Sequence, residues 1–210
     1  MSEKGFFMEK PLYQIGFWAA FVAFVAVVGF DIAQILQIIG MLRYPWDEIL
    51  IYGFSLFIAT PFMLSLLALH YITPEEKRFW SHAAVLFAVM YAIFVSFNYV
   101  VQLTAVIPFT DPEPVLIQTP HSLFWTADAL GYIALGFATF FAVPIFANQG
   151  LQKWVRWFFL ANALVTPLIA FVYFYPDFST TLLLLGSPWI VTTTGSIFLL
   201  ALFFWSRSKL

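Results

Sequence analysis

The sequence contains no cysteine, and only 10% of its 210 residues are charged. Without cysteine the chain has no disulfides, no thiolate metal ligands and no cysteine nucleophile. Soluble domains are about a quarter charged, so the shortage of charge argues against a soluble domain. The few Lys and Arg residues form no basic stripe, and we therefore expect no nucleic-acid partner.

Apolar residues take the place of the missing charge. They make up 62% of the chain, where a soluble domain has about half. The apolar residues form runs of about 20 residues or more, which is the length needed to cross a bilayer. The sequence therefore predicts an all-α, polytopic membrane protein in which residues 1–210 form one domain with six transmembrane helices. We expect these helices at about 11–40, 47–71, 74–107, 120–146, 151–175 and 180–204.

Capping signals predict where three of these helices begin. Asp47 is a plausible cap for the second helix. The segment Thr73-Pro74-Glu75-Glu76 has the pattern of a capping box for the third helix. For the fourth helix, Thr119 suits the N-cap and Pro120 suits the first helical position.

The first and last helices are less regular at their starts. We expect the first helix to start at Pro11 and to be retained, because the apolar run is too long for the core of a signal peptide. In the last helix, Gly186-Ser187-Pro188 interrupts the apolar run. This break predicts either a kink or a short interfacial helix followed by a span that starts at Pro188.

The positive charges indicate which way the chain crosses the membrane. With the N-terminus inside, the outer loops contain only one basic residue, Arg43, and the other eight lie at inner ends. The positive-inside rule then predicts a multi-pass protein of the plasma (cytoplasmic) membrane with both termini in the cytoplasm. An aromatic belt near the span ends is predicted from six tryptophans: Trp18, Trp46, Trp80, Trp154, Trp157 and Trp205.

In this orientation the polar side chains of the helices gather in the outer half of the membrane. Along the fourth helix, His121, Trp125, Asp128 and Tyr132 follow at i, i+4, i+7 and i+11 and so share one face. A carboxylate inside a bilayer is costly unless it is paired, protonated or facing water. We therefore expect an outward-facing pocket with aromatic walls and a polar floor near Asp128 and Asn98. The predicted ligand-binding residues are Asp128, Asn98, Trp125, Gln102, His121, Tyr132, Asp31 and Gln34.

Hydrogen bonds between helices are the alternative explanation for these polar residues. That explanation is favoured for Gln34, whereas the cost of a carboxylate favours a functional role for Asp128. A zinc site of three histidines is not available, because His70 and His82 are expected toward the inner side and His121 toward the outer side. A metal or haem site formed by His70 and His82 alone is a minor alternative. We predict no metal site, no cofactor and no catalytic residue.

Three functions remain open at this point. The first is binding or transport of a small organic or amphiphilic ligand, neutral or cationic because no Lys or Arg within the spans could neutralise an anion. The second is a lipid-modifying enzyme that uses Asp128 and His121 as acid and base. The third is a structural or assembly subunit without a ligand. The expected partners are the lipid bilayer and a small-molecule or lipid ligand, with a second copy or another membrane subunit also open.

Overall fold

The computed structural model describes the backbone of residues 3–209 and, apart from residues 3–9 and 180, their side chains. The described residues form helices and no strand. The six long helices are α1 (Glu3–Ile38), α2 (Trp46–Ile72), α3 (Arg78–Val101), α4 (Leu123–Ala142), α5 (Gly150–Phe174) and α7 (Pro188–Ser208). The short elements are α6 (Thr180–Leu183), a π-helical turn η2 (Gln102–Val106), and the 3-10 turns η1 (Glu75–Lys77), η3 (Pro114–Leu116), η4 (Val143–Ile145) and η5 (Leu184–Gly186).

All six long helices are long and apolar enough to cross a membrane. Their most apolar windows have a mean hydropathy between 1.6 and 2.2. This finding confirms the predicted six-helix, all-α class and indicates a multi-pass membrane protein. Large apolar side chains such as Phe57 and Val191 are exposed on the outside of the bundle, which suits contact with lipid.

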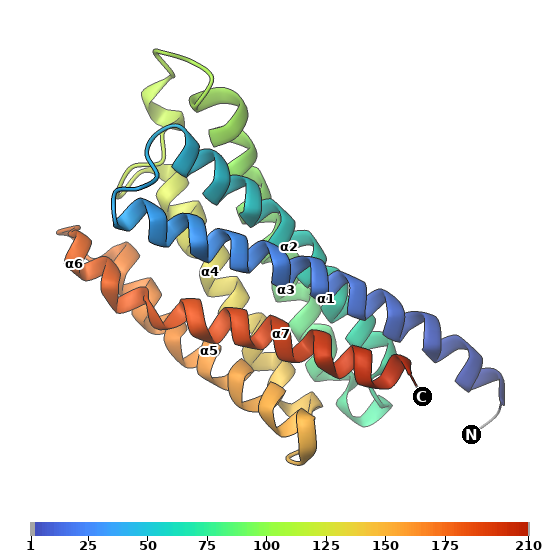
Figure 1. The fold of residues 1–210 in the computed structure, drawn as a ribbon. Helices are drawn as coiled ribbons and strands as arrows, with labels where there is room; N and C mark the ends of the chain where they lie inside the picture. The colour runs from blue at the N-terminus through green and yellow to red at the C-terminus, as the bar shows by residue number, and fades with distance from the viewer. Residues whose placement is uncertain (1–2, 210) are drawn as a thin grey trace.

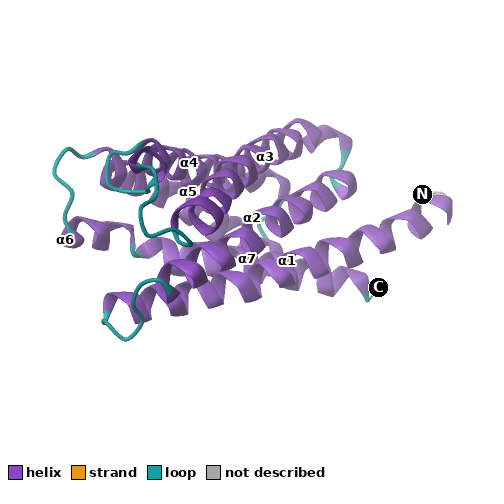
Figure 2. Cartoon of the chain, turned by 90° about the horizontal axis from the view of Figure 1, so that it is seen from above, coloured by secondary structure: helices purple, strands orange, loops and turns teal. Residues whose placement is uncertain are grey.

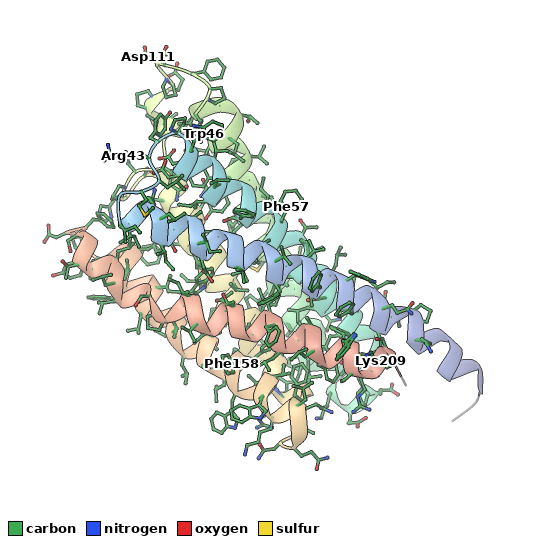
Figure 3. All side chains as sticks on the ribbon, in the orientation of Figure 1. Arg43, Trp46, Phe57, Asp111, Phe158 and Lys209 are labelled. Carbon is green, nitrogen blue, oxygen red and sulfur yellow. The ribbon has the colours of Figure 1, made fainter. Side chains whose placement is uncertain are left out.

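The long helices form a closed ring in the order α1, α2, α3, α4, α5 and α7. Each helix packs mainly against its two neighbours, and α7 packs against α1 to close the ring. Both chain ends lie at one end of the bundle, here named the termini end (Figure 1). The opposite end, named the loop end, carries residues 39–45, the long connection 107–122 and α6 (Figures 1 and 2). Arg43, Trp46 and Asp111 lie at the loop end, whereas Lys209 lies at the termini end (Figure 3).

Small residues allow the helices to pack closely. The α4 face toward its neighbours carries Ala134, Ala138 and Ala142, all buried. At Gly136 a β-carbon would collide with the side chain of Thr166 on α5. The two helices can therefore approach this closely only because residue 136 has no side chain.

The start of α4 differs from the prediction. The helix begins at Leu123, and Ser122 is its N-cap, with Oγ accepting a hydrogen bond from the Trp125 backbone N–H at 3.2 Å. Thr119 and Pro120 precede the helix in a turn, and His121 has a φ of +68°. This left-handed backbone cannot continue a helix, so the start moves three residues along the chain.

Two other predicted caps do not form, and the first helix starts earlier than predicted. Thr73 Oγ1 donates to the carbonyl of Leu69, so no capping box forms, and η1 leads into α3. Asp47 lies in the first turn of α2 and accepts a hydrogen bond from Gln37 instead of capping the helix. Helix α1 extends upstream of Pro11, which lies inside it. The predicted break in the last helix is present. The short elements α6 and η5 come first, and α7 starts at Pro188, as in the second of the two forms that the sequence allows.

Candidate functional site

The Asp128 carboxylate is the centre of one polar cluster at the loop end. It lies on α4, where it is only 2% exposed. The Tyr99 hydroxyl on α3 donates to Oδ1 at 2.7 Å, and the Tyr173 hydroxyl on α5 donates to Oδ2 at 2.5 Å. A third donor is the side-chain amide of Gln118, at 3.2 Å from Oδ2. Both oxygens of Asp128 are therefore bonded, and the cluster joins three helices.

Gln118 connects this cluster to the long connection between α3 and α4. Its side-chain oxygen accepts from Asn98 Nδ2 at 3.0 Å, while Asn98 also donates to the carbonyl of Phe124. Gln102, the first residue of the π-helical turn, donates to the carbonyl of Leu116 at 2.8 Å and accepts from the Gln118 backbone N–H at 3.3 Å. Asn98 and Gln102 thus hold residues 116–118 against the end of the bundle.

Asp31 on α1 is the centre of a second, smaller cluster. It is 7% exposed, and the Thr194 hydroxyl on α7 donates to its Oδ2 at 2.6 Å. Its Oδ1 is buried and has no hydrogen-bond partner among the described residues. The two aspartates therefore lie in different surroundings, one between α3, α4 and α5 and the other between α1 and α7.

A pocket opens between these two clusters. Its cavity volume is about 110 Å³. The wall is formed by α1, α4, α5 and α7, together with α6 and η5, and is mostly apolar. It is lined by Gln34, Ile38, Tyr132, Ile169, Val172, Tyr173, Leu183, Leu184, Gly186, Ser187, Trp189 and Ile190.

A continuous row of aromatic rings runs beside this pocket, and three of its members, Tyr132, Tyr173 and Trp189, line the pocket wall. Trp125 packs on Tyr173 with the ring centroids 4.5 Å apart, and its indole N–H donates to the Tyr173 carbonyl. Tyr132 lies next, 5.9 Å from Tyr173 and 5.2 Å from Trp189. Trp189 then contacts Phe30 on α1 at 5.5 Å. These contacts hold the rings in place, so the wall exists without a ligand.

Trp189 contributes a free hydrogen-bond donor to this wall. Its side chain is 7% exposed and lines the pocket, yet its Nε1 has no hydrogen-bond partner among the described residues. Buried polar groups normally have partners. The exposed tryptophans are those of the predicted belt, Trp18, Trp46, Trp80, Trp154, Trp157 and Trp205. The two remaining tryptophans, Trp125 and Trp189, belong to the aromatic row.

The structure brings together some of the predicted site residues and separates others. Asp128 and Asn98 share Gln118, and Gln34 and Tyr132 line the pocket. His121 is exposed in the turn before α4, and so it does not share a helical face with Asp128. None of the donors to Asp128 comes from His121 in the described part of the chain.

The sequence-based set did not include Gln118, Tyr99, Thr194 and Trp189. Gln118 lies in a connection for which no periodic pattern exists. Thr194 and Trp189 belong to a helix whose start was uncertain, so their face could not be assigned. Tyr99 could have been found, since it directly follows Asn98 and phenolic hydroxyls are common partners of buried acids.

Two histidines lie close together near the termini end. His70 Nδ1 lies 2.9 Å from Ser81 Oγ, and the rings of His70 and His82 are 5.5 Å apart. Among the side chains that the structure describes, residues 10–179 and 181–209, no group of three or more His, Cys, Asp or Glu is placed to hold a metal ion. Comparisons of this chain with protein-family models, curated proteins and solved structures gave no match.

Proposed function

We propose that this protein binds a small organic or amphiphilic ligand, neutral or cationic, in the pocket between α1, α4, α5 and α7. The observation that carries the proposal is a mostly apolar, aromatic pocket whose wall includes Trp189, a residue whose buried N–H has no partner among the described residues. Ligand sites typically combine apolar walls with a few polar groups that fix the orientation of the ligand. A carbonyl, ether or hydroxyl oxygen of a ligand would satisfy this donor.

The charge distribution supports a pocket that opens away from the cytoplasm. Lys77, Arg78, Lys153 and Arg156 lie in or beside the turns at the termini end, while Arg43 lies at the loop end. By the positive-inside rule the termini end faces the cytoplasm. The pocket at the loop end then receives its ligand from outside the cell or from the outer leaflet of the plasma membrane.

The pocket lining favours a neutral or cationic ligand. No Lys or Arg is among the lining residues, so an anion would lack a counter-charge there. The faces of Tyr132 and Trp189 can attract a cation through their ring quadrupoles. The Leu183 and Leu184 side chains, next to an exposed apolar surface, suit the tail of an amphiphile.

A binding experiment tests the proposal with two probes that share the same dodecyl chain and differ only in the polar group. Radiolabelled dodecanol and dodecylamine are titrated into nanodiscs that contain the protein, with empty nanodiscs as the blank. We expect saturable binding of at least one probe, and Ile190→Trp, which fills the pocket, should weaken it about tenfold or more. Val191→Trp is the matched control, because the neighbouring Val191 side chain is 66% exposed.

Two outcomes would contradict the proposal. Equal uptake of both probes by loaded and empty nanodiscs would show that the pocket does not bind amphiphiles, as expected for a structural subunit. Undiminished binding in Ile190→Trp would show that the probes bind elsewhere. A lipid-modifying enzyme would instead convert a labelled lipid, with turnover that depends on Asp128 and His121.

A further inference from the structure

Asp31 presents an unused hydrogen-bond acceptor close to the pocket. Its Oδ2 is occupied by Thr194, but its Oδ1 is buried without a partner among the described residues. Burying a carboxylate oxygen in this way is costly, because nothing replaces the water that it loses. The cost falls if a group from outside the protein supplies the missing donor.

Asp31 lies near the pocket along two helices, although it is not one of the lining residues. Gln34 follows Asp31 by three residues on α1, and Ile190 precedes Thr194 by four on α7. Both Gln34 and Ile190 line the pocket. Residues three or four apart share one helical face, so the pair of Asp31 and Thr194 lies about 5 Å, or one helical turn, beyond the lining. Trp189, which lines the pocket, is in edge-to-face contact with Phe30, the residue next to Asp31 in the chain.

Asp31 has no positively charged partner among the described residues. The only donor that the described residues give Asp31 is the neutral hydroxyl of Thr194. The described Lys and Arg side chains lie near the ends of the bundle, at Lys10, Arg43, Lys77, Arg78, Lys153, Arg156, Arg207 and Lys209. Asp128 differs, because three donors already surround its carboxylate.

We propose that Asp31 is the counter-charge for an ammonium group of the ligand, and that the ligand class is therefore an amphiphilic amine. This inference rests on the proposed function, because it places the amine of a pocket ligand at the floor. An N–H of the ammonium group donates to Asp31 Oδ1, and the apolar chain extends past Tyr132 and Trp189 toward Leu183. The aromatic faces along the path favour a cation over a neutral headgroup.

The two probes of the binding experiment separate this inference from the proposed function. Wild-type protein should bind dodecylamine about tenfold or more tightly than dodecanol, since a buried charge-assisted pair adds to the apolar contacts. Asp31→Asn should remove this preference and leave dodecanol binding unchanged. Thr194→Val keeps the charge and removes the competing donor, so the preference for the amine should persist. Asp111→Asn, in the exposed connection, is the control and should behave as wild type.

The remaining outcomes of this experiment would contradict the inference alone or the proposed function as well. Equal affinity for both probes in the wild type would overturn the inference and leave the proposed function standing. Binding of neither probe would refute both. An amine preference that survives in Asp31→Asn would move the counter-charge elsewhere and overturn the inference. A rise in melting temperature with NaCl that requires Asp31, without any preference for the amine, would assign the site to an inorganic cation and also overturn it.

Discussion

Two buried aspartates at the same end of the bundle differ in the number of donors that reach them. Asp128 accepts hydrogen bonds from Tyr99, Tyr173 and Gln118, whereas Asp31 accepts one from Thr194. A carboxylate whose two oxygens both accept hydrogen bonds can hold helices together, but it has few acceptor positions left for a ligand. The comparison shows that burial alone does not tell how an acid is held, because the number of donors at its oxygens differs between the two.

Asp128→Ala should have the largest effect on stability. The substitution removes the acceptor of three donors and leaves Tyr99, Tyr173 and Gln118 unpaired. Hydrogen bonds between helices in membrane proteins average about 0.6 kcal/mol and reach about 1.7 kcal/mol. We therefore expect a loss of about 2–5 kcal/mol in the free energy of unfolding, measured by SDS titration in mixed micelles.

The exposed Asp111 provides the control for this change. Asp111→Ala removes the same charge from the surface of the connection between α3 and α4, and should change stability by less than about 0.5 kcal/mol. If Asp128→Ala were equally harmless, the cluster around Asp128 would not hold the bundle together, and the contrast with Asp31 would disappear.

Gln118→Ala should have the next largest effect. It removes the bonds to Asn98 and Asp128 but leaves the backbone bond to Gln102. Two lost bonds correspond to about 1–3 kcal/mol. The segment 107–122 should also become more sensitive to protease, which gel electrophoresis and mass spectrometry of the fragments can measure. Gln149→Ala, at an exposed position of the termini end, should change neither property.

Tyr173→Phe should have a smaller effect and tests whether the Asp128 cluster and the pocket are independent. The substitution removes one hydrogen bond to Asp128, worth about 1 kcal/mol, and keeps the ring contacts with Trp125 and Tyr132. Because the ring still lines the pocket, the affinity for dodecylamine should stay within about threefold of wild type. Tyr175→Phe, at an exposed position, is the control. A large loss of affinity would show that the hydroxyl, and with it Asp128, belongs to the binding site.

The sequence predicted the helices better than the contacts between them. Apolar length alone is enough to identify a spanning helix, since the bilayer fixes how long it must be. The predicted caps failed where a polar side chain could form a different hydrogen bond. Thr73 bonds back to Leu69 and Asp47 accepts from Gln37, although both residue types also suit a cap.

The polar clusters could be predicted only in part. Periodicity places Trp125, Asp128 and Tyr132 on one face of α4, and the structure shows them there beside Tyr173. Periodicity within one helix does not show which other helix packs against it. The packing of α7 against α1, which closes the ring, therefore could not be predicted from periodicity. The partnership of Asp31 with Thr194, 163 residues away, depends on it.

Asp31→Asn should have the smallest effect on stability, and it is the sharpest test of the comparison. The Asn oxygen can still accept the bond from Thr194, so the contact between α1 and α7 is kept. Removing the charge relieves the cost of an oxygen without a partner, while the new amide N–H₂ adds a smaller cost of the same kind. The two effects oppose each other, and the free energy of unfolding should change by less than about 1 kcal/mol in the same SDS titration. A loss as large as that expected for Asp128→Ala would mean that Asp31 is already fully engaged in the fold. Near-neutral stability together with a lost preference for the amine would instead separate the two acids by role, one for the bundle and one for the ligand.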